Sequence, residues 1–144
     1  MSNSLVKYFT TNHSAGSDLG LLLFRLTFAL VLLYGHGLDK LMVIIKGQEI
    51  QFMDPIGIGM KLSFYLAAFA EGVCAILLVL GLFTRFAALT LTINFIVILV
   101  FHGLIVKDAF NILEIRFLYL LSYFALIFTG AGRYSLDAVF MNRK

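Results

Sequence analysis

The chain has 144 residues, of which 61% are hydrophobic, with a mean hydropathy of +0.98 and a formal net charge of +3. This apolar share exceeds that of soluble domains, and one soluble core of this size could not bury so many aliphatic and phenylalanine side chains. Only 13% of the residues are charged, which is too sparse for the basic face of a nucleic-acid-binding protein. Composition therefore predicts one compact domain in a lipid bilayer, with no nucleic-acid partner.

Four apolar runs are each long enough to cross that bilayer, at residues 19–37, 62–83, 86–106 and 112–129. A hydrocarbon core of about 30 Å requires about 20 residues of helix, so each run is a candidate transmembrane helix. Cys74, the only cysteine, lies inside the second run. One thiol allows neither an internal disulfide nor a dithiol redox pair, so we expect Cys74 to be a small apolar filler between helices.

The runs divide the chain into a polar N-terminal tail at residues 1–18, a membrane domain at 19–137 and a basic C-terminal tail at 138–144. We expect Ser17 or Asp18 to cap the first helix by accepting hydrogen bonds from its free N–H groups. No small-residue cleavage site follows the first run. The run is therefore expected to be a retained anchor and not a cleaved signal peptide.

The connection between the first two runs, residues 38–61, is long, partly apolar and contains the only proline, Pro55. Residues 41–45 are apolar but too short to span, so they either continue the first helix or lie along the interface. The rest of the connection either anchors at the interface or folds back over the mouth of the bundle. The other two connections are short, and short connections make neighbouring helices antiparallel. The predicted fold class is all-α, an integral membrane four-helix up-down-up-down bundle.

Charged residues inside the runs are the first candidates for function, because a charge facing lipid is costly. Arg25, Glu71, Glu114 and Arg116 should therefore face the bundle interior or the water interface. Counted along antiparallel helices, Arg25 and Glu71 approach the membrane middle from opposite ends, and we predict a buried ion pair between them. The pair would either fix the helix register or belong to a substrate or proton path.

A second polar group is predicted at the mouth of the bundle opposite the termini. His36, Asp39 and Lys40 follow the end of the first run, His102 lies near the end of the third, and Glu114 lies near the start of the fourth. Imidazole and carboxylate groups there could bind a polar headgroup, relay protons or hold a metal. The spacing of helical metal motifs is absent, so no metal is expected. A rim of this kind above apolar walls suits a quinone or a lipid.

An even number of spans places both termini on one side of the membrane. We expect Arg85 and Arg133 to mark the interface on that side. The positive-inside rule favours cytoplasmic termini by a single residue, because five basic residues face four. The two sets are Lys7, Arg85, Arg133, Arg143 and Lys144 against Lys40, Lys46, Lys61 and Lys107.

Five segments together carry a resemblance to a known family. They are Phe24-Arg25, Gly35-His36-Gly37-Leu38-Asp39-Lys40, Ala70-Glu71-Gly72, Gly81-Leu82-Phe83-Thr84-Arg85 and Gly130-Ala131-Gly132-Arg133-Tyr134-Ser135-Leu136-Asp137. In this order the chain resembles the DoxX family of small bacterial membrane proteins from residue 19 to residue 137. The resemblance implies a multi-pass protein of the bacterial inner membrane.

The resemblance also sets the functional expectations. The family's name refers to a subunit of a membrane thiosulfate:quinone oxidoreductase, and other members are associated with redox or oxidative-stress assemblies. The resemblance implies no catalytic residues for this chain. We therefore expect a quinone-contacting or non-catalytic membrane subunit of an oxidoreductase assembly, with a redox partner subunit or further copies of itself. The alternatives are a small transporter and a structural membrane-stress accessory protein. No covalently bound cofactor is expected, a quinone is the candidate ligand, and enzymatic activity is left open.

Overall fold

The computed structural model describes residues 14–141, and every regular element within that range is helical. The parts of the predicted tails at residues 1–13 and 142–144 lie outside the described range. In chain order the elements are α2 (Ser14–Leu32), η1 (Leu33–Gly37), α3 (Leu38–Ile45), α4 (Met60–Ala68), η2 (Phe69–Cys74), α5 (Ala75–Leu80), α6 (Thr84–Val100), η3 (Phe101–Val106), α7 (Phe110–Thr129) and α8 (Leu136–Met141). The elements η1 and η2 are π-helical turns set within the first and second spans, and η3 is a π-helical turn that ends the third.

Four of the described helices are long and apolar enough to cross a bilayer, as the sequence predicts. They are Gly16–Ile45, Met60–Leu80, Thr84–Val106 and Phe110–Thr129. The first has 30 residues, which is about 45 Å of helix and well beyond a hydrocarbon core of about 30 Å. Residues 41–45 thus continue the first helix, which was one of the two alternatives for this segment.

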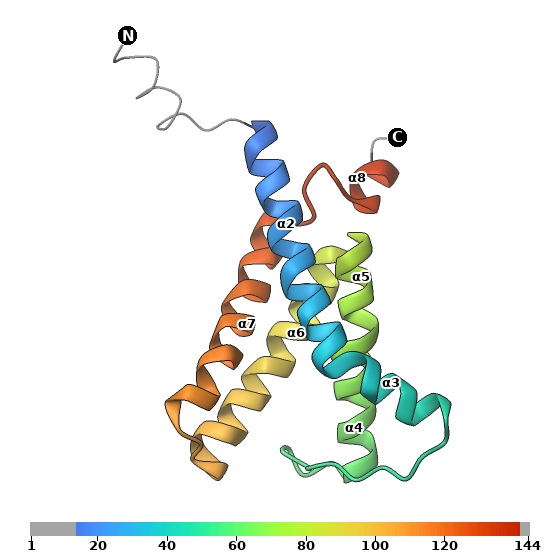
Figure 1. The fold of residues 1–144 in the computed structure, drawn as a ribbon, viewed down its shortest axis with the longest axis vertical. Coiled ribbons are helices and arrows are strands. Elements are labelled where there is room, and N and C mark those ends of the chain that lie inside the picture. Colours follow the sequence, from blue (N-terminus) through green and yellow to red (C-terminus); the bar gives the residue numbers. More distant parts are fainter. Residues whose placement is uncertain (1–13, 142–144) are drawn as a thin grey trace.

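Figure 1 shows the start of α2, the turn between α5 and α6, and α8 at one end of the molecule. The connection at residues 46–59 and the turn between η3 and α7 lie at the other end. We call these the hairpin end and the loop end. Contacts between α6 and α7 are the most extensive, α2 packs on α5, and η1 packs on η2. The up-down order of the spans across a bilayer stays a prediction.

Small side chains line the contacts between helices. Among the residues whose burial the structure describes, seven alanines are buried: Ala29, Ala67, Ala68, Ala70, Ala75, Ala87 and Ala88. Cys74 is fully buried in the same cluster, as expected of a small filler. Large apolar side chains such as Leu23, Phe117 and Leu121 are exposed on the outside. Small residues inside and large apolar residues outside are typical of membrane helices, whose outer faces are solvated by lipid.

Candidate functional site

A cavity of about 260 Å³ lies between the second and third spans. Its walls are formed by α4 and η2 on one side and by α6 on the other. Four lining residues are polar, namely Ser63, Glu71, Thr90 and Asn94, and the others are apolar. An apolar protein cavity of about 150 Å³ is known to bind benzene, so this cavity has room for one substituted ring.

The connection at residues 46–59 covers this cavity. Phe52, Pro55 and Ile56 contribute to its lining, and the Phe52 ring packs edge-to-face on Phe64 at 5.4 Å. The connection therefore folds back over the bundle, which was the second of the two alternatives that its sequence left open. It covers the space between the second and third spans and not the predicted mouth.

Asp54 holds the covering connection in place. Its carboxylate accepts hydrogen bonds from the backbone N–H groups of Ile58 and Gly59, at 3.1 and 2.7 Å, and from the Ser63 hydroxyl at 2.7 Å. The Ser63 hydroxyl and the Gly59 N–H keep the pKa of Asp54 below its ordinary value. Asp54 thus ties the connection to the first turn of α4, next to the cavity.

Glu71 is buried at the polar end of the cavity, with only 5% of its surface exposed. Its Oε2 lies 2.7 Å from Lys40 Nζ, and its Oε1 accepts a hydrogen bond of 3.1 Å from Asn94 Nδ2. Lys40 comes from α3, Glu71 from η2 and Asn94 from α6, so one carboxylate joins three spans. A buried carboxylate that is paired and hydrogen-bonded in this way keeps its charge at a much lower cost than an isolated one.

Two glycines bring the first and second spans close enough to form this contact. A Cβ atom on Gly37 would collide with the backbone carbonyl of Glu71, and one on Gly72 would lie 2.7 Å from Leu41 Cγ. Both glycines lie in π-helical turns, η1 and η2, which frequently mark functional sites in helices. The backbones therefore touch where Glu71 leaves its helix, and Lys40 follows Gly37 by less than one turn.

The predicted ion pair between Arg25 and Glu71 is wrong. Arg25 lies at the hairpin end, where a Cβ atom on Gly81 would be 2.8 Å from its Cζ. Glu71 lies beside Gly37, about 15 Å further along the bundle by helix rise. The predicted pair assumed that the end of the first apolar run and the start of the second lie at the same height along the bundle. The first helix continues through α3, so the run ends near the middle of the second span.

Arg25 instead binds the segment that follows the fourth span. Its guanidinium donates to the carbonyls of Ala131 and Tyr134, at 2.7 and 2.9 Å. In the same segment, Asp137 accepts hydrogen bonds from the N–H groups of Phe83 and Thr84, at 2.8 and 2.9 Å. Asp137 thereby caps the N-terminus of α6. The first helix, the hairpin and the C-terminal segment are joined at this end.

Two further arginines also lie at the hairpin end. Arg85 Nη2 is 3.5 Å from the carbonyl of Phe128, and Arg133 is largely exposed. Asp18, a predicted helix cap, lies inside α2 and accepts a hydrogen bond of 3.4 Å from the Arg133 backbone N–H. The cap prediction fails because α2 already includes Ser14. The interfacial position of Arg85 and Arg133 in a bilayer stays a prediction.

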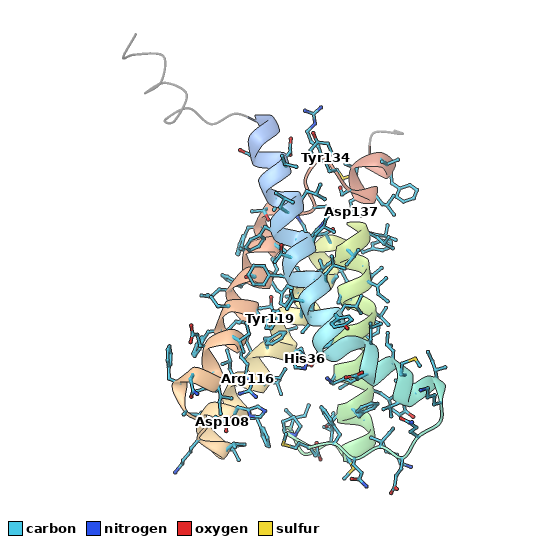
Figure 2. The ribbon with its side chains drawn as sticks, in the orientation of Figure 1. His36, Asp108, Arg116, Tyr119, Tyr134 and Asp137 are labelled. Carbon is cyan, nitrogen blue, oxygen red and sulfur yellow. The ribbon has the colours of Figure 1, made fainter. Side chains whose placement is uncertain are left out.

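The predicted mouth of five polar residues does not form. Lys40 turns inward to Glu71, whereas His36, Asp39 and Glu114 are exposed. Figure 2 shows His36 on the first span, and Asp108 and Arg116 by the turn between η3 and α7. The prediction assumed that the first helix ends at residue 37. Because it continues to Ile45, the residues expected at its end lie along its side.

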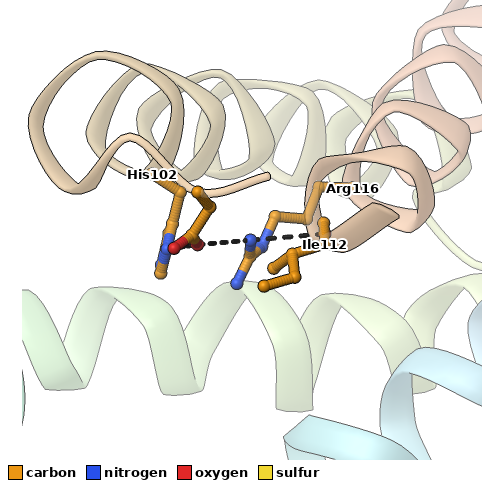
Figure 3. A network of polar contacts seen from close by, with 4 residues as sticks. His102, Ile112 and Arg116 are labelled. Atoms are coloured by element: carbon orange, nitrogen blue, oxygen red, sulfur yellow. Dashed lines mark hydrogen bonds and ion pairs between the residues drawn. The ribbon is translucent and has the colours of Figure 1, made fainter. Parts of the chain in front are cut away.

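His102, the remaining member of the predicted mouth, belongs to a separate cluster (Figure 3). Its Nδ1 lies 2.8 Å from Asp108 Oδ2, and Arg116 Nη1 lies 3.1 Å from the same oxygen. The hydrogen bond with His102, followed by that from Arg116, keeps the pKa of Asp108 below its ordinary value. The backbone N–H of Asp108 also donates to the carbonyl of His102 at 2.9 Å. The cluster fixes the turn between η3 and α7.

Sequence reasoning missed Asn94. The signal was present, because Asn94 carries the only side-chain amide in the run at residues 86–106. A polar side chain inside an apolar span is expected to find a partner on a neighbouring helix. The same reasoning would have favoured Lys40 over Arg25 as the partner of Glu71 once the first helix was extended past Gly37.

Comparison with known proteins gives a family but no individual relative. No curated protein sequence and no solved structure matches the chain significantly. The DoxX family model matches residues 20–103. That range includes Gly37, Lys40, Glu71 and Asn94, and also Arg25. Because the family model covers more than half of the chain and four described helices are suited to span a membrane, this protein is a multi-pass membrane protein of the DoxX family.

Proposed function

We propose that the protein is a quinone-contacting membrane subunit of an oxidoreductase assembly, and that the cavity between the second and third spans holds the quinone ring. The observation that carries the proposal is the cavity of about 260 Å³, apolar along its walls and polar at the Glu71 end. Ligand sites of this type combine apolar walls with a few polar groups that orient the ligand. A quinone ring has flat apolar faces and polar oxygens at its edge, so it suits such a site.

A membrane quinone also carries a long apolar tail, which needs a route to the lipid. Leu66 and Ile93 line the cavity, yet 50% and 55% of their surfaces are exposed on the outside of the bundle. The cavity therefore borders the surface that lipid would cover. A tail can leave between these two side chains while the ring stays inside.

Electron transfer in this proposal depends on a partner. The chain's only thiol, Cys74, is buried outside the cavity lining. Electrons would therefore reach or leave the ring through a partner subunit, with the chain supplying the binding site. We further propose a bacterial inner-membrane location with cytoplasmic termini, which labelling single cysteines at Ser2 and Asn142 after replacement of Cys74 would test.

The test of ligand binding is quinone content after purification in mild detergent. The variant Ala67→Phe fills the cavity, because Ala67 is buried in its lining. The control Ala125→Phe makes the same change on the exposed face of α7. We expect the wild type and the control to retain quinone on extraction, and the cavity variant to lose most of it.

Thermal unfolding followed by circular dichroism gives an independent measurement. A ligand present at about 100 times its Kd stabilises the folded state by about 2.7 kcal/mol. A short-chain quinone should therefore raise the unfolding midpoint of the wild type and of Ala125→Phe, but not of Ala67→Phe. Absence of both co-purified quinone and stabilisation by added quinone would refute the proposal.

A further inference from the structure

We infer that the polar end of the cavity selects the hydroxyl form of its ligand, so that the site binds a hydroquinone in preference to a quinone. This inference rests on the proposed function and adds the ligand's redox state. It follows from a count of the hydrogen-bond donors and acceptors that the cavity walls leave free.

Donor hydrogens in the lining are almost all engaged. The Ser63 hydroxyl donates to Asp54 at 2.7 Å, and the Thr90 hydroxyl donates to the carbonyl of Phe86 at 3.0 Å. Asn94 uses one amide hydrogen on Glu71. Among the lining side chains that the structure describes, only the second amide hydrogen of Asn94 is left for a ligand.

Acceptor sites, in contrast, remain in excess. An ionised carboxylate offers about four lone-pair directions, and the hydrogen bonds of Glu71 with Lys40 and Asn94 use two of them. The amide oxygen of Asn94 adds a further acceptor, since its nitrogen must face the carboxylate for the 3.1 Å contact to be a hydrogen bond. The ligand must therefore bring donor hydrogens of its own.

Lys40 pairs with the Glu71 carboxylate without itself lining the cavity. Its ammonium lies 2.7 Å from Glu71 and 3.5 Å from the carbonyl of His36, and it is not part of the cavity lining. As the anionic partner in this ion pair, the Glu71 carboxylate accepts hydrogen bonds and offers none. Lys40 thus balances the charge from the far side and leaves the cavity side of Glu71 free to accept.

The two redox forms of the ring meet these groups differently. A hydroquinone hydroxyl can donate to Glu71 and accept the free hydrogen of Asn94. A quinone carbonyl can only accept, so it places its lone pairs against those of the carboxylate. A hydrogen bond to a charged group typically contributes enough for at least about a tenfold difference in affinity. We expect hydroquinone to bind at least about tenfold more tightly than quinone.

Isothermal titration calorimetry in detergent without oxygen tests this inference with three probes. They are decylhydroquinone, its dimethyl ether and the corresponding decylquinone, which share ring and chain but differ in donor hydrogens. The wild type should prefer decylhydroquinone over both other probes by at least about tenfold. The double variant Lys40→Met with Glu71→Gln, which keeps the net charge of the site, should lose that preference.

Controls separate this inference from the proposed function. Asp39→Asn removes an exposed carboxylate beside Lys40 and should leave the preference unchanged. If the double variant does not fold, the comparison of decylhydroquinone with its dimethyl ether in the wild type serves instead: both have oxygens that accept hydrogen bonds but only the hydroquinone donates, so equal affinity for the two would overturn the inference. Equal binding of all three probes, abolished by Ala67→Phe, would overturn the inference and leave the proposed function standing. Binding of none of them would overturn both.

Discussion

The contact between the first and second spans predicts that Gly37→Ala destabilises the protein, whereas Gly35→Ala does not. Both glycines lie in η1 and differ by two positions. A Cβ atom on Gly37 would collide with the backbone carbonyl of Glu71, but one on Gly35 would meet nothing within 4 Å. The pair therefore separates steric conflict from the ordinary effect of replacing glycine in a helix.

The magnitudes follow from two opposing effects. Replacing glycine by alanine inside a helix favours folding by about 1 kcal/mol, and this gain applies to both variants. At position 37 the added methyl presses on backbone, which cannot rotate away, and overpacking of this kind costs about 1–3 kcal/mol. The separation of η1 from η2 would also weaken the Lys40–Glu71 contact. Because the collision is with backbone, we take the upper end of that cost, so we expect Gly37→Ala to lose about 2 kcal/mol and Gly35→Ala to gain up to about 1 kcal/mol.

Cys74 provides the assay. It is the only cysteine and is fully buried, so a dye that becomes fluorescent on reaction with a thiol reports unfolding in detergent. For a chain of this size, 1 kcal/mol corresponds to about 2–4 °C in the unfolding midpoint. Gly37→Ala should unfold about 4–8 °C below the wild type, and Gly35→Ala at or slightly above it. A midpoint for Gly37→Ala equal to that of Gly35→Ala would refute the reasoning.

Three further predictions follow from the same contacts. Asp137→Ala removes the cap of α6 and should lower stability by about 1–2 kcal/mol in the thiol assay, and an unchanged midpoint would contradict the capping role. Lys40→Met alone leaves Glu71 buried without its cation and should cost about 3 kcal/mol, of which adding Glu71→Gln recovers part; strictly additive effects would exclude their contact. Because the pKa of Asp108 is lower in the folded state, its contribution to stability is complete above about pH 4 and is lost as the pH falls through the folded pKa. Acid unfolding of Asp108→Asn should lack that component, and identical acid profiles would contradict the role of its contact with His102.

The number and nature of the spans were predictable because they depend on chain-local properties. A run of about 20 apolar residues has few alternatives in a chain this hydrophobic. The short connections and the small side chains between helices are also visible in sequence. Whether residues 41–45 belong to the first helix could not be predicted, because an apolar stretch is compatible both with a transmembrane helix and with a segment that lies along the interface.

That one ambiguity accounts for much of the error in the candidate site. The choice of Arg25 as partner for Glu71 required the register between two helices, and the register shifts when one helix is longer than its apolar run. Register is set by Gly37 and Gly72, whose role depends on what lies opposite them. The cavity could not be predicted either, because it is formed by the packing of three separate segments, including the connection that covers it.

The hairpin end also has a consequence for the order in which the chain is made. Arg25 enters the membrane with the first helix, but the carbonyls that bind it belong to Ala131 and Tyr134, which are 106 and 109 residues later. Until the ribosome has released that segment, the guanidinium must rely on water, lipid phosphate or the insertion machinery. The hydrogen bonds of Arg25 are therefore completed only after residues 131–134 have been synthesised, although Arg25 itself lies in the first span. A nascent chain stalled before residue 131 lacks both carbonyls, so its Arg25 has neither of these hydrogen bonds.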